Sequence, residues 1–117
     1  MYKPAVTLAV ALLVQTHASF AAEAEEDNSR IASCRLIVDG SEYISGRCRF
    51  RPMGNDGSFQ IMGGNGKYFA QVHVSVPGSG TGYWNQEAYA NHAHSDLGEL
   101  TREGACWTNE RASVCAW

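Results

Sequence analysis

The chain has 117 residues, with 9 Lys and Arg against 12 Asp and Glu, which gives a formal net charge of −3. This balance argues against a nucleic-acid partner, because a phosphate backbone is bound by basic surfaces. The length predicts one domain whose core is limited by its small size.

The first segment has the layout of a secretory signal peptide. Lys3 gives it a positive start, Ala5–Val14 is mostly apolar, and small residues follow. We place cleavage after Ala21, although a cut after Ala24 also fits the pattern. Because a bilayer span needs about 20 apolar residues, this run is too short to anchor the chain. We therefore expect residues 1–21 to be removed on export to the periplasm or the medium, with no stable membrane insertion.

Residues 22–32 are predicted to form an acidic leader, because Glu23–Asp27 carries most of the excess negative charge. A single β domain is expected to follow over residues 33–117.

The first clear strand pattern is Tyr43–Arg51. Ile44, Cys48 and Phe50 fall on one face of this segment, and three arginines fall on the other. Such an arginine stripe could meet an anionic polymer of the cell envelope. The favoured interpretation is a solvated outer face paired with carboxylates of neighbouring strands. The stripe consists of Arg47, Arg49 and Arg51.

Two further strands are predicted around a glycine-rich turn at residues 63–66. Ser58–Met62 and Lys67–Val76 flank this turn and should pair as a hairpin. The second of them is expected to bury one side, which consists of Tyr68, Ala70, Val72, Val74 and Val76.

Shorter strands are predicted towards the end of the chain, and Gln86–His94 is the one competing helix. The expected fold is therefore all-β, a small antiparallel meander that is closed or nearly closed into a barrel. The shorter strands are Gly82–Glu87, Leu97–Arg102, Ala105–Thr108 and Ser113–Trp117.

Four cysteines can reinforce this small domain with disulfides in an oxidising compartment, and they allow three pairings. Cys106 and Cys115 lie symmetrically about a turn at residues 109–112, so a hairpin would place them opposite each other. Cys34 and Cys48 flank a second turn in the same way. These two pairs are favoured, and zinc is disfavoured because no two cysteines have a close ligand spacing.

A further candidate site lies at His92, His94 and Asp96, which would share one face of an extended segment, as transition-metal ligands do. A polar loop is the favoured interpretation, because no further His or Glu completes a catalytic set. Trp107 is expected to pack in the core. No nucleophile motif is evident. We therefore expect no enzymatic activity, no cofactor and no bound metal.

Pro77–Gln86 carries three glycines within five residues and then two large aromatics, Tyr83 and Trp84. One interpretation is a protruding loop that exposes both rings. The competing interpretation is a hairpin loop whose rings fold back over the open end of the barrel. If exposed, the two rings could also stack on sugars, which would make the chain a carbohydrate-binding module for peptidoglycan.

Ser79-Gly80-Thr81-Gly82-Tyr83 has the form S-G-x-x-Y. This pattern resembles the inhibitory loop of the periplasmic and membrane-bound bacterial lysozyme inhibitors, which are small exported all-β proteins. The resemblance implies that the loop enters the lysozyme cleft, where the hydroxyls of Ser79 and Tyr83 engage two catalytic carboxylates and Gly80 allows close approach. Gly46–Phe50 and Gly104–Trp107 are also similar to periplasmic proteins of alphaproteobacteria that inhibit host-type lysozyme.

The chemistry of such an inhibitor is plausible on its own terms. A retaining glycosidase presents two carboxyl groups about 5 Å apart, one protonated and one ionised. Hydroxyls suit this mixed pair because each can donate or accept. Since two such bonds contribute about 1.5–3 kcal/mol each, and nanomolar binding needs about 12 kcal/mol, most affinity would come from the rings of Tyr83 and Trp84. The sequence thus favours an inhibitor of c-type host lysozyme that helps its source evade host defence.

Overall fold

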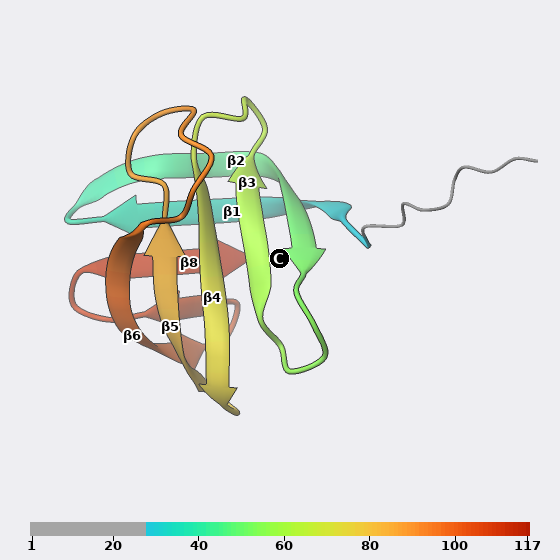
Figure 1. Cartoon of the computed structure of the whole chain (residues 1–117), viewed down its shortest axis with the longest axis vertical. Coiled ribbons are helices and arrows are strands. Elements are labelled where there is room, and N and C mark those ends of the chain that lie inside the picture. Colours follow the sequence, from blue (N-terminus) through green and yellow to red (C-terminus); the bar gives the residue numbers. More distant parts are fainter. Residues whose placement is uncertain (1–27) are drawn as a thin grey trace, which may run out of the picture.

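The computed structural model describes residues 28–117, so the predicted signal peptide and most of the predicted leader lie outside the described residues. Within that range, antiparallel strands follow one another in sequence order, and β8 pairs with β1 to close a barrel (Figure 1). The strands are β1 (Arg30–Val38), β2 (Ser41–Pro52), β3 (Phe59–Gly63), β4 (Phe69–Val76), β5 (Ser79–Trp84), β6 (Ser95–Glu103), β7 (Cys106–Thr108) and β8 (Ala112–Ala116).

The all-β class and the closed antiparallel barrel predicted from the sequence are confirmed. Residues 28–117 contain no helix, and hence none that is long and apolar enough to cross a membrane. The helix considered at Gln86–His94 is wrong, because this segment is an irregular loop. The folded part also begins earlier than residue 33, since Arg30 already pairs with Phe50 of β2.

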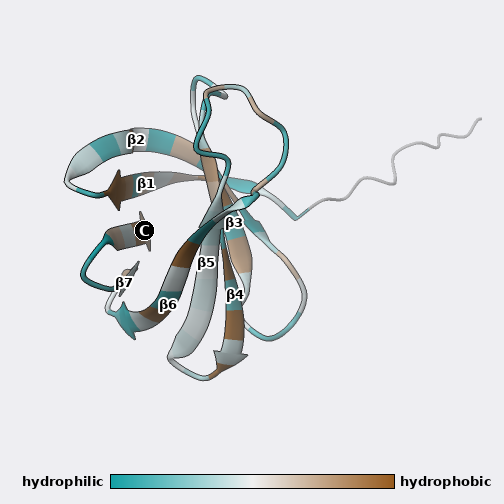
Figure 2. Cartoon of the chain, turned by 60° about the vertical axis from the view of Figure 1, so that its left-hand side comes forward, coloured by the Kyte–Doolittle hydropathy of each residue, from teal (hydrophilic) through white to brown (hydrophobic). Residues whose placement is uncertain are grey.

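The core lies inside the barrel and comes from alternate positions of the strands, which appear as alternating hydrophobic and hydrophilic bands along β4 in Figure 2. Trp107 is buried in this core, as expected. The largest fully buried apolar side chains of the core are Leu36, Ile61, Leu97, Leu100, Val72 and Val114.

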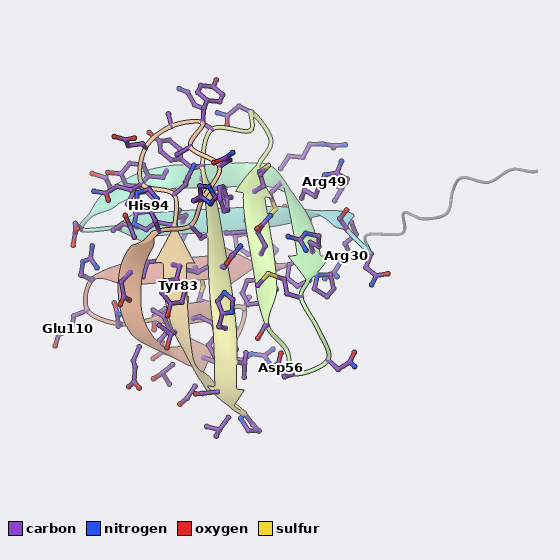
Figure 3. The ribbon with its side chains drawn as sticks, in the orientation of Figure 1. Arg30, Arg49, Asp56, Tyr83, His94 and Glu110 are labelled. Atoms are coloured by element: carbon purple, nitrogen blue, oxygen red, sulfur yellow. A yellow bond between two sulfur atoms is a disulfide. The ribbon has the colours of Figure 1, made fainter. Side chains whose placement is uncertain are left out.

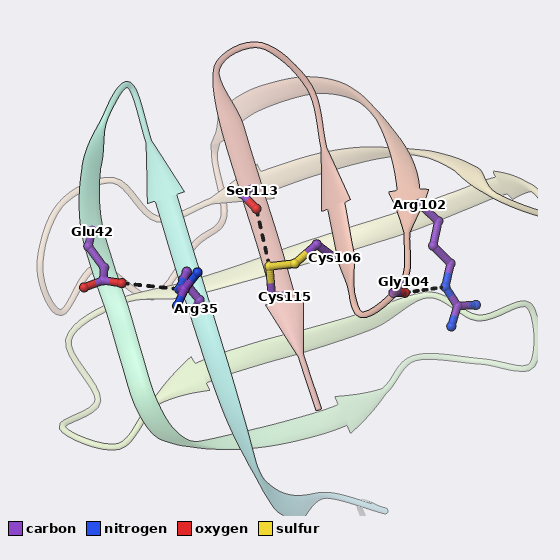
Figure 4. The surroundings of a disulfide bond; sticks show 7 residues. All are labelled: Arg35, Glu42, Arg102, Gly104, Cys106, Ser113 and Cys115. Atoms are coloured by element: carbon purple, nitrogen blue, oxygen red, sulfur yellow. Dashed lines mark hydrogen bonds and ion pairs between the residues drawn. A yellow bond between two sulfur atoms is a disulfide. The ribbon is translucent and has the colours of Figure 1, made fainter.

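Both favoured disulfides are confirmed. Cys106 and Cys115 are directly opposite each other on β7 and β8, with Cα atoms 4.0 Å apart (Figure 4). Cys34 and Cys48 join β1 to β2, with Cα atoms 5.8 Å apart. In a small domain each bridge contributes about 2–4 kcal/mol by restricting the unfolded chain.

The predicted burial along β4 holds for Ala70 and Val72 but is wrong for Val76, which is 57% exposed. The pairing of β4 with β5 shifts register between Val74 and Val76. Such a bulge inserts an extra residue and redirects the side chains beyond it. Val76 therefore lies outside the core, at the tip of the β4–β5 hairpin.

The loop after β5 is organised by one buried side chain, Asn85, which has no exposed surface. Its Oδ1 accepts the Phe69 N–H at 3.1 Å. Its Nδ2 donates to the carbonyls of Lys67, Glu87 and Ala90 at 3.0–3.2 Å. The amide thus ties the loop to the start of β4.

Candidate functional site

The S-G-x-x-Y segment is not a protruding loop, because Ser79–Trp84 forms strand β5. It pairs along its length with β4 on one side and β6 on the other. Paired on both sides, its backbone N–H and C=O groups take part in the sheet. The predicted strand start at Gly82 is therefore corrected to Ser79, and the segment cannot enter a cleft as a free loop.

Side chains alternate along β5, so the motif is divided between two faces. Ser79, Thr81 and Tyr83 point to the outer face, whereas Trp84 points inward. At about 3.3 Å per residue, the Cα atoms of Ser79 and Tyr83 lie about 13 Å apart. The two hydroxyls consequently lie on the same outer face of β5 but not at one loop tip.

The packing of the barrel wall explains why positions 80 and 82 of the motif are glycines. A Cβ atom on Gly80 would lie 2.5 Å from the carbonyl oxygen of His73 in β4. On Gly82 it would lie 2.6 Å from Cδ1 of Leu100 in the core. Close packing of the barrel wall therefore requires both glycines, a constraint that depends on neighbouring strands and leaves no signal in the local sequence.

Trp84 is only 4% exposed, so it is neither a surface anchor nor part of a sugar-stacking platform. Its ring packs against Tyr43, with centroids 4.7 Å apart, and against Tyr68 at 6.1 Å. Tyr83 behaves differently and stays half-buried on the outer face, where it meets His73 edge to face at 5.4 Å. The two neighbouring aromatic side chains thus lie on opposite faces of the barrel wall.

The candidate site is the outer face of β5, formed by Ser79, Thr81 and Tyr83, and we call it the β5 face. Glu99 pairs with Thr81 and Asp96 pairs with Tyr83, so exposed carboxylates of β6 border this face. Figure 3 shows Tyr83 and Glu110 on one side of the view and Arg30 and Arg49 on the other. The hydroxyls of Ser79 and Tyr83 have no hydrogen-bond partner within residues 28–117 and are available to a ligand.

The β5 face ends at the β4–β5 hairpin, which projects as the lowest point of the barrel in Figure 1. Its tip carries exposed Val76, then Pro77 and Gly78, before Ser79. The hairpin is held by a bond from Ser75 Oγ to the Ser79 carbonyl at 3.1 Å, and by one from the Arg102 N–H to the Gly78 carbonyl at 2.9 Å. The result is an ordered apolar tip with a free serine hydroxyl at its base.

The other candidate residues are not brought together as ligands. Within residues 28–117, no three His, Cys, Asp or Glu side chains are placed to hold a metal ion. His94 Nδ1 bonds to the His92 carbonyl at 3.0 Å, and Asp96 accepts the Gly98 N–H. The segment from His92 to Asp96 thus uses these groups in its own turns.

The arginine stripe lies on the outer face of β2, as predicted, but without the expected carboxylates. In the described part of the chain, ion pairs join Arg35 to Glu42 at 3.5 Å and Arg111 to Asp39 at 3.1 Å. Arg49 instead donates to Ser29 Oγ at 3.1 Å. The three stripe guanidinium groups therefore have no carboxylate partner within residues 28–117.

Asp56 organises the turn before β3, because its Oδ1 accepts the Ser58 N–H at 2.9 Å. This hydrogen bond lowers the pKa of Asp56 from its ordinary value of 3.8. A lowered pKa stabilises the fold above the ordinary value, and this contribution is lost as pH falls through the folded-state pKa. We expect Asp56→Asn to melt slightly below the wild type at neutral pH, with the difference vanishing in acid. Thermal unfolding across this pH range would show it, and a constant difference would contradict it.

Comparison of the chain with protein-family models gave no match, and neither the curated proteins nor the solved structures contain a significantly similar one. The function must therefore be argued from the geometry of the β5 face and from the S-G-x-x-Y pattern that it carries.

Proposed function

We propose that the chain is an exported inhibitor of c-type lysozyme that binds the enzyme through the β4–β5 hairpin tip and the adjoining β5 face. The predicted signal peptide and the two disulfides support export, because disulfides persist in oxidising compartments. The inserting element in this proposal is the hairpin tip and not the whole Ser79–Trp84 segment.

The observation that carries the proposal is the position of Ser79. It stands at the base of a projecting tip, with a hydroxyl that has no partner within residues 28–117. A narrow two-stranded tip can enter a cleft shaped for a sugar chain, and its hydroxyl can donate to one catalytic carboxylate. Exposed Val76 and Pro77 then supply apolar contact.

The charges around the β5 face also support binding of a cationic enzyme at this face. Asp96 and Glu99 border the part of the β5 face at Thr81 and Tyr83, whereas Arg102 lies beside the hairpin tip and the arginine stripe lies on β2. A cationic enzyme would be attracted to the acidic border, and such complementarity raises association rates more than affinity. Inhibition should therefore weaken as salt is added.

The expected interaction free energies and positions of the two motif hydroxyls indicate different roles for them. One hydrogen bond from Ser79 to a carboxylate contributes about 1.5–3 kcal/mol. Tyr83, about 13 Å further along the strand, reaches the rim of the cleft and adds the contact area of its ring. We infer that Ser79 and Val76 dominate affinity and that Tyr83 contributes less.

Clearing of a peptidoglycan suspension by c-type lysozyme is expected to slow as the purified protein is added. Ser79→Ala should weaken inhibition about tenfold, since 1.4 kcal/mol corresponds to a factor of ten. Val76→Ser should have a comparable effect, and Tyr83→Phe a smaller one. Full clearing at a large molar excess of wild-type protein would refute the proposal for the lysozyme used.

Ser45→Ala is the matched control, because Ser45 is an exposed serine on the outer face of β2, away from the hairpin. It removes the same hydroxyl and should leave inhibition unchanged. Equal weakening by Ser45→Ala and Ser79→Ala would show that the hairpin has no special role.

The second candidate, a peptidoglycan-binding module, loses its proposed platform because Trp84 is buried. The same assay still separates the two functions. A protein that covers the substrate would also slow clearing by an unrelated peptidoglycan amidase, whereas an inhibitor of lysozyme would not.

A further inference from the structure

A recess lies at the end of the barrel where β2 and β4 terminate, and it does not include the β5 face. It has a volume of about 450 Å³, and every strand except β5 contributes to its lining. Pockets of this size hold small organic ligands, and the mouths of β-barrels are frequent sites for them. The question is which chemistry this lining would select.

The floor of the pocket is aromatic. Phe59 and Trp107 are 5% and 7% exposed, and their rings lie 6.5 Å apart. Phe50 stacks on Phe59, with centroids 5.2 Å apart and planes inclined by only 21°. Val74 completes the apolar part of the lining. Flat ring faces of this kind favour a planar or compact apolar group.

The rim of the pocket carries two guanidinium groups from opposite ends of the sequence. Arg30 lies over the Phe50 ring, with its Cζ 4.3 Å from the centroid. Arg102 is fixed by a hydrogen bond from its Nε to the Gly104 carbonyl at 3.1 Å (Figure 4). Neither forms an ion pair with a carboxylate in residues 28–117. Two oriented guanidinium groups that form no ion pair are suited to an anion.

Asp56 also lines the pocket, and one of its oxygens is already engaged by the Ser58 N–H. Its ordinary pKa of 3.8 already makes this carboxyl ionised at neutral pH, and the hydrogen bond from the Ser58 N–H lowers the pKa further. The rim therefore holds two positive charges and one negative charge. Such a balance favours a monoanion over a ligand with several negative charges.

Trp107 adds an unmet hydrogen-bond donor. Its indole N–H has no partner within residues 28–117, although the side chain is more than nine-tenths buried. Buried donors are nearly always paired with protein or with an ordered molecule. A ligand oxygen in the pocket would satisfy this group.

We propose that this pocket binds a small amphiphilic monoanion. Its aromatic or compact apolar body packs against Phe59, Val74 and Trp107. Its carboxylate or sulfonate is held by Arg30 and Arg102 at the rim. The pocket shares Pro77 and Gly78 with the hairpin tip, but none of Ser79, Thr81 and Tyr83 lines it, and binding of the anion is tested without lysozyme.

Titration with anilinonaphthalene sulfonate, an aromatic monoanion, tests the proposal on the full folded protein. We expect one molecule to bind, with a rise in probe fluorescence. Neutral N-phenylnaphthylamine, which keeps the rings and lacks the charge, should bind at least about tenfold more weakly, since one charge-assisted contact is worth about 1.5–3 kcal/mol. Equal affinity of the two probes for the wild type would overturn the anion site.

Variants locate the site. Arg30→Gln and Arg102→Gln should each weaken binding of the sulfonate about tenfold and leave the neutral probe nearly unchanged. Arg47→Gln is the matched control, because Arg47 is an exposed arginine on β2 that does not line this pocket. If Arg47→Gln weakens binding as much as Arg102→Gln, or if several probe molecules bind, the proposal is wrong.

Trp107→Phe keeps an aromatic floor and removes the indole N–H. It should weaken sulfonate binding while far-UV circular dichroism stays that of the wild type. Because the comparison of the two probes uses only wild-type protein, a variant that fails to fold does not remove the test.

Discussion

Replacing Asn85 with alanine is expected to lower the free energy of unfolding by about 3–5 kcal/mol. The side chain is fully buried, and its amide makes hydrogen bonds to four backbone groups. Alanine would leave the Phe69 N–H and three carbonyls without this partner, and a buried unpaired group costs about 1–3 kcal/mol. Small domains are stable by only about 5–15 kcal/mol, so the loss is a large share.

Urea unfolding would measure this loss, and Asn91→Ala is its control in the same loop. Asn91 is exposed and makes no side-chain hydrogen bond with another described residue. Its replacement should change stability by less than about 0.5 kcal/mol. Similar midpoints for Asn85→Ala and the wild type would mean that the loop does not depend on the amide.

Gly80→Ala is expected to destabilise the barrel by about 3 kcal/mol or more, because the new methyl group has no room. Its Cβ would meet three backbone atoms of β4 within 3.1 Å, the closest being the His73 carbonyl oxygen at 2.5 Å. Backbone atoms cannot move aside as a flexible side chain can. Relief would require β4 and β5 to separate, which breaks the pairing between them.

Gly63→Ala is the matched control for Gly80→Ala, because Gly63 is also a strand glycine. A Cβ there would find its nearest atoms at 3.5 Å, which is ordinary contact. Its melting temperature should stay close to that of the wild type, while that of Gly80→Ala falls by well over 10 °C. A Gly80→Ala protein that folds normally and only loses lysozyme inhibition would instead assign this glycine to the interface.

Several features of the fold could be predicted because they depend on residues that are close in the sequence. Alternation marked β2, β3 and most of β4, and the glycine-rich turn at residues 63–66 marked the hairpin between β3 and β4. The spacing of Cys106 and Cys115 about their turn indicated the correct pairing. Each of these features is visible within a window of about ten residues.

The candidate site was harder to predict. The S-G-x-x-Y pattern lies in the β4–β5 hairpin and the strand that follows it, yet its glycines were assigned to a loop, and Trp84 was left either as an exposed anchor or as a ring folded over the end of the barrel. Local composition cannot distinguish a glycine that bends a loop from one that a neighbouring strand forces to be small. The inward position of Trp84 became evident only from the pairing of β5 with β4 and β6.

The amino-acid sequence by itself therefore determined the all-β class, strands β2 to β4, the turn between β3 and β4, and the two disulfides, since each depends on local alternation and spacing, whereas β1 was not predicted. Only the tertiary structure decided the start of β5, the exposure of Val76 and the meeting of Arg30 with Arg102 at one pocket. These features depend on strand register and on closure of β8 against β1. A one-residue change of register reverses which side chains face inward, and the bulges that shift the register on both sides of β5 depend on its pairing with β4 and β6.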